Sequence, residues 1–358
     1  MEIKASSDVQ KKRICIICFP SYPSKETGRG IDKYSYELLN GLKKLGICPL
    51  VIEDGVVKDS LQYMVKDTRL FTRVIKVKAD LYHAVSELAA KNMILARKPL
   101  SIVTIHDMFA FCFSSTAPLK YSYQKFCLSL ASRSSRIIAT SETTKNLLTR
   151  ILKVSPEKVK VIYYGVDHQM FRPIPRIEKE NKTILYLGSL TKLKGVHVLI
   201  KAFKLVQREF KSAELIIGGK RKDYTLFQDI AHQSDSKKHI KFPGFITDEE
   251  LPNYYSSCDV FVWPALAGIT LSVLDAMACG APVVINDAFD AREYIGNAGI
   301  LVEPGNVQQL AEAILYILRN EDVGRIYSQK AIKRAELFSW GKMVKETLNL
   351  YNDILNKD

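Results

Sequence analysis

The chain has 358 residues, of which 47% are hydrophobic and 25% are charged, and its formal net charge is +14. This length exceeds one domain of average size and fits two, and the composition is that of an ordinary globular protein. No apolar run approaches the roughly 18 residues of a membrane span, and the polar start MEIKASSDVQKKR lacks the apolar core of a signal peptide. We therefore expect a cytoplasmic protein.

The positive charge is concentrated in the first half of the chain. Through Arg172 there are 28 Lys and Arg against 15 Asp and Glu, and from Pro173 onward there are 24 against 23. This asymmetry favours an anionic partner for the first half, such as a membrane surface or a lipid phosphate, and a solvated basic surface is the alternative. No recognised DNA or RNA motif accompanies the charge, so nucleic acid is not expected as a partner.

The seven cysteines are scattered and odd in number, which argues against a disulfide framework. Cys15 and Cys18 form C-x-x-C inside the apolar run ICIICF. This run is typical of a strand, where residues three apart point to opposite faces, so neither a redox nor a metal-binding role is expected.

The first half predicts strands that alternate with helices. Ile14 to Phe19 is typical of a buried strand, and a Pro, Ser and Gly rich loop to Gly30 precedes a helix from Ile31 to Leu45 that Gly46 ends. Further short apolar runs lie at 48–52, 74–77, 81–85, 102–105, 137–139 and 159–163. This alternation predicts a parallel sheet with both faces covered.

A linker with two prolines and many charges follows residue 167, and a second series of strands and helices begins at Thr183. Its predicted strands are ILYLG, ELIIGG, HIKFPGF, DVFVWP, VVI and GILV. Its predicted helices start at Lys194, near Leu226, at Asp248 and after the loop that holds Gly268, Ile269 and Thr270. The last two helices run from Val307 to Leu337, with a break, and from Trp340 to Ile354.

The segment AGITLSVLDAMACGAPVV, which starts at Ala267, predicts a phosphate site at the start of a helix. Unpaired backbone amides at such a start, together with the helix dipole, favour a diphosphate. The residues that would supply these amides are Gly268, Ile269 and Thr270. Asp275 lies four residues beyond Leu271 on the same helix face, where its carboxylate can accept hydrogen bonds from sugar hydroxyls. A generic α/β unit would have the same pattern.

This segment resembles the donor-binding signature of the retaining, metal-independent glycosyltransferases of family four. In that family two glutamates, separated by seven residues, occupy positions that here hold Ala267 and Asp275. The stretches VIYYGVDHQMFRP, LYLGSLTKLKG, KFPGFITDEELPNYYSSCDVFVWP and FSW also follow the order of the family's motifs. The resemblance implies an α/β protein of GT-B fold, with two Rossmann-like domains whose parallel sheets face each other across a cleft that holds the donor.

The same resemblance implies a division of labour along the chain. Residues 1–172 would form a basic, acceptor-side domain, residues 173–338 a domain that binds the nucleotide sugar, and residues 339–358 a helix that returns to the first domain. Lys194, in TKLKG, matches the lysine that contacts the donor diphosphate. Ser189 stands where most members carry arginine, so the stabilisation of the leaving group would be weaker or would come from elsewhere, for example from Lys220, Arg221 and Lys222.

Further site residues follow from the resemblance. His106, in VTIHD, would meet the donor sugar near the reacting carbon, and Asp107 would either orient His106 or cap the following loop. Gly28 and Gly30 match the family's glycine loop, which lies against the donor phosphates. The backbone near Phe245 and Ile246 would meet the base. Arg292 and Glu293 lie in the last piece of the signature, although a simple helix start would explain an acid there equally well.

The function implied is transfer of a sugar from a UDP- or GDP-sugar to an acceptor hydroxyl with retention of configuration. No cofactor is expected, and no metal either, because the chain has no D-x-D motif. The acceptor would be a glycan or a lipid-linked sugar. Aromatic and basic residues at 109–136 would bring the first half to an anionic membrane surface, although each aromatic residue could also belong to the core.

Two alternatives remain open at this stage. Ala267 and Ser189 remove two polar contacts that many active members use, which would fit a non-catalytic subunit that binds sugar nucleotides or glycans. A sugar-nucleotide epimerase of the same two-domain fold matches the motifs less well.

Overall fold

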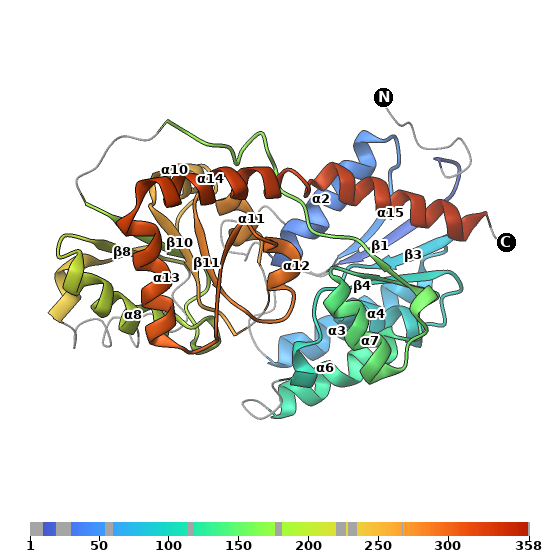
Figure 1. Ribbon diagram of the computed structural model, residues 1–358. Helices are drawn as coiled ribbons and strands as arrows, with labels where there is room; N and C mark the ends of the chain where they lie inside the picture. The colour runs from blue at the N-terminus through green and yellow to red at the C-terminus, as the bar shows by residue number, and fades with distance from the viewer. Residues whose placement is uncertain are drawn as a thin grey trace. The chain divides into compact units, whose positions relative to one another are not determined.

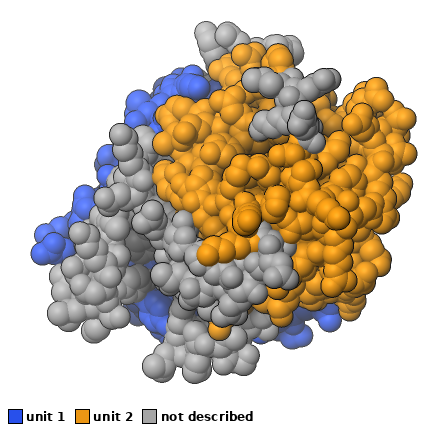
Figure 2. Space-filling view, turned by 90° about the vertical axis from the view of Figure 1, so that its left-hand side faces the viewer, with its two compact units in different colours: residues 1–165, 340–358 blue, residues 166–339 orange. Residues whose placement is uncertain are grey.

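The computed structural model describes residues 10–18, 30–53, 60–112, 118–175, 181–219, 227, 235–266, 268 and 270–356. The chain forms two compact units (Figures 1 and 2). Unit 1 comprises residues 1–165 and 340–358, and unit 2 comprises residues 166–339. Each unit is built on one six-stranded sheet whose described strand pairs are all parallel.

The sheet of unit 1 has the order β2-β1-β3-β4-β5-β6. Its strands are β1 (Ile14–Cys18), β2 (Leu50–Glu53), β3 (Leu81–Ala84), β4 (Ser101–Ile105), β5 (Arg136–Ala139) and β6 (Val159–Val161). Every residue of β1, β3 and β4 is buried, as expected for strands with helices on both faces. The helices are α2 (Gly30–Lys44), α3 (Ser60–Lys76), α4 (Glu87–Leu95), α5 (Phe109–Cys112), α6 (Pro118–Ala131), α7 (Glu142–Leu152) and α15 (Trp340–Leu355).

The sheet of unit 2 has the order β12-β11-β10-β7-β8-β9. Its strands are β7 (Thr183–Leu187), β8 (Glu214–Gly218), β9 (Ile240–Gly244), β10 (Val260–Trp263), β11 (Val283–Asn286) and β12 (Gly299–Val302). Its helices are α8 (Val196–Glu209), α10 (Leu251–Ser257), α11 (Leu271–Ala278), α12 (Ala291–Ile295), α13 (Val307–Arg319) and α14 (Glu321–Ala335). Short 3-10 turns lie at Pro156–Lys158 in unit 1 and at Lys192–Lys194 and Asp235–His239 in unit 2.

Each sheet has one point at which the strand order reverses. In unit 1 the reversal lies between β1 and β3, and in unit 2 it lies between β7 and β10. The loops that leave two such neighbouring strands run in opposite directions, and this opens a crevice at the carboxyl ends of the strands. Ligands of open α/β sheets bind at this position, so the described loops that follow β3, β7 and β10 are candidates for ligand binding.

The last helix packs in unit 1, far in sequence from the rest of that unit. α15 lies against α2, and a Cβ added at Gly41 would come within 2.4 Å of Val344 Cγ2, so the helices approach closely. On the unit 2 side, Val166 pairs with Ser339 in an isolated parallel bridge, and His168 Nε2 donates to Phe338 O at 2.9 Å. These contacts tie Val166 and His168 to the end of unit 2. Residues 166–172, which we expected in the first domain, belong to unit 2.

The apolar run at 74–77 is not the short strand that we predicted. Residues 74–76 form the last turn of α3, in which Leu70 and Val74 are fully buried while Ile75 is 50% exposed. Burial that recurs after four residues is the period of a helix. The helix predicted near Leu226 lies outside the described residues, apart from Phe227.

Candidate functional site

Two loops meet at the strand reversal of unit 2. The loop after β7 carries Ser189 and Lys194, and the loop after β10 leads to the start of α11. Leu266 N donates to Leu193 O at 3.0 Å, which links the two loops directly. In unit 2, most of the described residues that we predicted for the donor site therefore lie in two adjacent loops. Both loops lie at the carboxyl ends of the strands.

Close backbone packing fixes the first of these loops. Gly195 has φ +70°, and a Cβ there would lie 1.9 Å from Pro264 O, so only glycine fits. Lys194 ends the 3-10 turn just before Gly195, whereas the sequence predicted a helix from Lys194. Ser189 contributes its carbonyl oxygen, which accepts the Tyr186 hydroxyl hydrogen at 3.0 Å.

The second loop is fixed from β11 and from the segment that follows it. Asn286 Nδ2 donates to Pro264 O at 2.7 Å and to Ala265 O at 3.2 Å. A Cβ at Gly268 would come within 2.2 Å of Asp290 Oδ1, so the backbone at Gly268 lies directly against this buried acid. Ala267 and Ile269, both predicted as donor-site residues, lie outside the described residues.

The helix start predicted from the sequence is present. α11 begins at Leu271, and Thr270 is its N-cap, but the Thr270 side chain makes no capping hydrogen bond. Its Oγ1 atom is buried and has no hydrogen-bond partner within the described part of the chain. Asp275 is only 4% exposed on the same helix. An N-terminus with an unsatisfied hydroxyl beside it is suited to receive an anionic ligand with oxygen acceptors.

An aromatic pair that the sequence analysis did not single out lies between the two loops. The rings of Tyr186 and Trp263 are stacked at 5.6 Å with an interplanar angle of 6°. Lys194 Nζ lies 4.9 Å from the centroid of the Trp263 ring, a cation–π contact. Tyr186 is fully buried and Trp263 is 3% exposed, so the pair forms a rigid platform under the lysine.

The residues predicted to meet the base follow β9. Phe245 is 47% exposed, whereas Ile246 is 7% exposed. A Cβ at Gly218 would lie 2.7 Å from Ile246 Cδ1 and 2.6 Å from Leu187 Cδ2, so Ile246 packs over the ends of β7 and β8. Ile246 therefore lies near the first loop, and Phe245 presents its ring to solvent.

His106 follows β4 in unit 1, as predicted, and both of its ring nitrogens have partners. Nε2 is 2.8 Å from Val85 O, and Nδ1 is 2.9 Å from the Tyr164 hydroxyl. The carbonyl can only accept, so Nε2 carries the hydrogen and Nδ1 accepts from Tyr164. The ring also stacks on Tyr164 and meets Tyr34 edge-on at 5.1 Å. Burial lowers the pKa of His106, so the ring is neutral at pH 7.

A second buried histidine belongs to a polar network that includes the Tyr34 hydroxyl. His83 Nε2 lies 2.9 Å from Thr104 Oγ1, which is itself 3.0 Å from the Tyr34 hydroxyl. His83 Nδ1 lies 2.6 Å from the Tyr351 hydroxyl of α15. Burial lowers the pKa of His83 to about 3 and raises the pKa of Tyr34 to about 12, so both groups are neutral. The network joins α2, β3, β4 and α15 in the interior of unit 1.

Two carboxylates lie near His106 at the same edge of the sheet. Asp107 is exposed, and its Oδ1 accepts from Phe109 N at 2.9 Å, so it caps the following loop. Burial, followed by the charge of Asp107, raises the pKa of Glu87 to about 7. Glu87 begins α4 directly after β3 and was not predicted, because an acid in the first turn of a helix is common.

The glycines and the remaining predicted residues have varied surroundings. Gly30 begins α2, and a Cβ there would meet nothing within 4 Å, so its neighbours in the described structure do not demand glycine. Arg292 pairs with Asp287 on the surface. Gly28 and residues 220–222 lie outside the described residues. Burial raises the pKa values of Cys15 and Cys18 to about 12, which disfavours the reactive thiolate of each.

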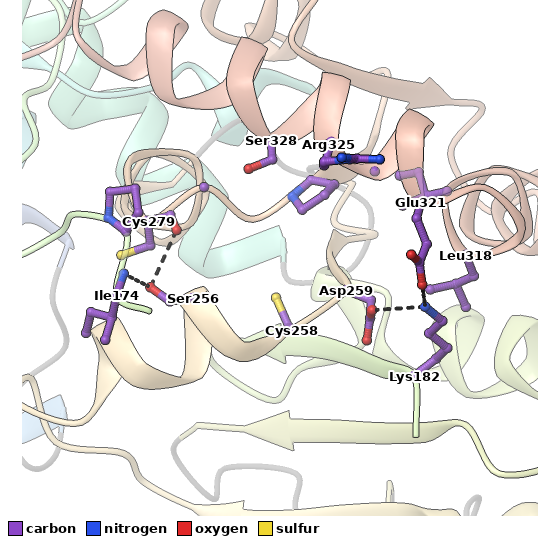
Figure 3. Close-up of a pocket in the computed structure, with 15 residues that line it drawn as sticks. Ile174, Lys182, Ser256, Cys258, Asp259, Cys279, Leu318, Glu321, Arg325 and Ser328 are labelled. Carbon is purple, nitrogen blue, oxygen red and sulfur yellow. Dashed lines mark hydrogen bonds and ion pairs between the residues drawn. The ribbon is translucent and has the colours of Figure 1, made fainter. Parts of the chain in front are cut away.

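A groove of about 800 Å³ lies at the amino ends of the strands of the unit 2 sheet (Figure 3). Lys182, Asp259 and Pro282 line it, and each directly precedes a strand, namely β7, β10 and β11. Lys182 Nζ lies 3.2 Å from Glu321 Oε1 and 3.8 Å from Asp259 Oδ1 (dashed in Figure 3). None of the predicted donor-site residues lines this groove.

Two family models match the chain and together span residues 28–336. The model described as Glycosyltransferase Family 4 matches residues 28–170, and the model described as Glycosyl transferases group 1 matches residues 167–336. The O-antigen chain mannosyltransferase B of Escherichia coli is 25% identical over 269 residues, which cover 70% of each chain.

Solved structures resemble the whole chain. Sucrose-phosphate synthase from Thermosynechococcus elongatus has a TM-score of 0.84 at 18% identity, and the match covers 97% of this chain and 100% of that one. The HepE protein of Anabaena, in complex with UDP and glucose, has a TM-score of 0.74 at 19% identity, with 95% and 99% covered. Within the described residues, no helix is both long and apolar enough to span a bilayer.

Proposed function

The chain belongs to the glycosyltransferases of family four and group one, which have the GT-B fold, and we propose that it transfers a hexose from a nucleotide diphosphate hexose to an acceptor hydroxyl with retention of anomeric configuration. The observation that carries the proposal is the meeting of two loops at the strand reversal of unit 2. There the Lys194 ammonium on its aromatic platform, the start of α11 and the Thr270 hydroxyl, which has no hydrogen-bond partner among the described residues, belong to adjacent loops.

The proposed reaction breaks the bond between the anomeric carbon and the diphosphate oxygen and forms a bond from that carbon to the acceptor oxygen. The acceptor proton goes to the departing phosphate. Negative charge grows on the diphosphate as the bond breaks, and the Lys194 ammonium and the amides at the start of α11 stabilise it. We propose that the reaction requires no metal ion, because these groups supply the positive charge that a metal would otherwise provide.

His106 has a different part in this proposal. Its ring is neutral and its two nitrogens are engaged, so it would orient the donor sugar rather than transfer a proton. The Asp275 carboxylate on α11 would accept hydrogen bonds from the donor's hydroxyls. Unit 1 would bind a glycan or a lipid-linked acceptor at the cytoplasmic face of a membrane, consistent with its positive charge.

The test is release of nucleotide from a panel of UDP- and GDP-hexoses, with GDP-mannose first because a relative is named a mannosyltransferase. Alkyl glycosides and glycolipids serve as acceptors, and NMR coupling at the anomeric proton of the product reports retention. Lys194→Met should lower kcat/KM by about 10²- to 10³-fold. Lys192→Met, in the same 3-10 turn, is the matched control. Activity that EDTA abolishes would contradict metal independence.

A second candidate is a non-catalytic subunit that binds sugar nucleotides. It is favoured by Ser189, which offers no charge where most family members carry arginine, and by Ala267 in place of a glutamate. Binding of nucleotide sugar without turnover, with every acceptor of the panel, would support this candidate over the transferase. Failure to bind any nucleotide sugar would contradict both.

A further inference from the structure

Trp263 has a place in the fold that its sequence context does not reveal. It is the last residue of β10, next to β7, and its ring stacks on Tyr186 of that strand. A Cβ at Gly188 would lie 2.7 Å from the Trp263 ring and 2.9 Å from the Tyr186 hydroxyl. The first loop therefore begins with a residue that has no side chain, which leaves room for the two rings.

The aromatic platform touches both loops of the proposed donor site. Trp263 Nε1 donates to Gly268 O in the second loop at 3.4 Å, and the Tyr186 hydroxyl donates to Ser189 O in the first loop at 3.0 Å. The Lys194 ammonium, from the end of the first loop, lies over the Trp263 face. A single indole thus contacts the cation of one loop and the backbone of the other.

We propose that Trp263 is a positioning residue that holds the Lys194 ammonium ready for the donor's diphosphate. A lysine side chain is long and loses much rotamer freedom when it is fixed, so an ammonium already held against a ring binds an anion at a lower entropic cost. With a serine at 189, this cation carries more of the interaction than it would beside an arginine.

The inference rests on the proposed function, because it concerns the same diphosphate. Calorimetric titration with UDP, GDP, ADP and dTDP, and with the matching nucleosides, tests it. For the diphosphate that the wild type binds, Trp263→Leu should raise Kd by about fivefold, since a cation–π contact of ordinary strength is lost. Trp263→Phe, which keeps an aromatic face, should raise Kd less. Binding of the nucleoside should not change, because under this proposal Lys194 would contact only the phosphates.

A double-mutant comparison of Trp263 and Lys194 is a second measurement, and it does not require Trp263→Leu to fold well. In a Lys194→Met background, Trp263→Phe should have no further effect on the Kd of the diphosphate, because the interaction is already absent. Fluorescence adds a direct signal. Trp263 and Trp340 are the two tryptophans of the chain, so in Trp340→Phe protein the emission should change on addition of the diphosphate, and it should change less when Lys194→Met is also present.

Four results would overturn the proposal. If Trp263→Leu leaves the Kd of the diphosphate unchanged, the ring does not position the lysine. If that variant weakens the nucleoside and the diphosphate equally, or if the effects of Trp263→Phe and Lys194→Met simply add, the ring has only a structural role. If the wild type binds no nucleoside diphosphate at all, both this inference and the proposed function are wrong, which distinguishes the two failures.

Discussion

His106 has one protonation state and one tautomer in this structure. Nε2 donates to Val85 O, Nδ1 accepts from Tyr164, and burial keeps the ring neutral. A general acid or base needs a nitrogen that can reach the substrate and a pKa near the working pH. Both ring nitrogens of His106 have protein partners, and burial lowers the pKa of the ring, which agrees with the proposal that the leaving phosphate takes the acceptor proton.

Tyr164→Phe should raise the pKa of His106. The Tyr164 hydroxyl donates to the unprotonated Nδ1 and so stabilises the neutral ring, and its loss makes protonation easier. Burial opposes the protonated ring, while the hydrogen bond to Val85 O and the charge of Asp107 favour it. If turnover needs the neutral ring, activity of the variant should fall as the pH drops below neutral, in a range where the wild type is constant.

Histidine NMR titration measures this pKa directly, alongside the pH profile of kcat/KM. Tyr163→Phe is the control, because Tyr163 bonds to neither ring nitrogen of His106. A titration of His106 that is the same in Tyr164→Phe and in the wild type would show that the hydroxyl does not set its protonation.

Gly195 and Gly30 give a matched pair of variants, because they differ in the space that the described structure leaves for a new Cβ. Gly195→Ala should destabilise the protein by at least about 2 kcal/mol, because φ is +70° and the new Cβ would clash with Pro264 O. Gly30→Ala should keep or raise Tm, since the position opens a helix and no atom of the described residues lies within 4 Å of the new Cβ. If Gly30 serves approach of the donor, the same variant should lower kcat/KM. Thermal melting and steady-state kinetics separate the two effects, and a large loss of Tm in Gly30→Ala would contradict this account.

At the scale of elements, α15 is attached to unit 1 by polar bonds as well as by apolar packing. The Tyr351 hydroxyl bonds to His83 Nδ1, and Trp340 meets Tyr34 edge-on at 6.5 Å. Tyr34 also contacts His106 and Tyr164 through its ring. The last helix is therefore connected, through buried side chains, to the histidine of the candidate site.

Tyr351→Phe should lower the free energy of unfolding by about 1–3 kcal/mol, because it leaves a buried His83 nitrogen without its partner and creates no large cavity. Denaturant unfolding measures the change. Tyr316→Phe, whose ring is 53% exposed on α13, is the control and should change stability by less than about 0.5 kcal/mol. Equal effects of the two substitutions would contradict the role assigned to the network.

Most elements could be predicted from the sequence because their signals are local. Apolar runs such as ICIICF and DVFVWP gave strands, and Gly46 ends a helix with φ +81°. The prediction of a strand at 74–77 was wrong, because four consecutive apolar or long residues fit a strand and the end of a helix equally well. Only the burial of Leu70 and Val74 distinguishes them, and that burial depends on the packing of α3 in the folded unit.

A residue of the site could be predicted only where the sequence around that residue has a recognisable local pattern. The start of α11 and the placement of His106 after a strand follow from local pattern. Trp263 and Tyr164 lie far in sequence from the residues that they contact, Lys194 and His106. An aromatic residue at the end of a strand is most often core, so nothing in the sequence itself separates these two from the other buried rings.

At the scale of the whole molecule, the charge follows the two units. Unit 1 contains 30 Lys and Arg against 17 Asp and Glu, whereas unit 2 contains 22 against 21. Some of the aromatics at 109–136 belong to the core, since Phe109 and Phe111 pack against the buried cluster of unit 1. Phe126 does not, for it is 52% exposed on α6, one residue beyond Lys125. An exposed ring on a basic unit is suited to an anionic lipid surface.

We therefore expect the protein to bind vesicles that contain phosphatidylserine or phosphatidylglycerol at low salt, and to leave them as the salt concentration rises, because screening weakens attraction between exposed charges. Phe126→Ser should weaken this binding, since it removes apolar area that the bilayer interface would bury. Tyr316→Ser removes a ring of similar exposure from the nearly neutral unit 2 and should leave binding unchanged. Co-sedimentation with vesicles of stated composition measures both. Equal binding to neutral phosphatidylcholine vesicles would show that the charge of unit 1 does not direct the association, and the expected acceptor would then be a soluble glycan rather than a membrane lipid.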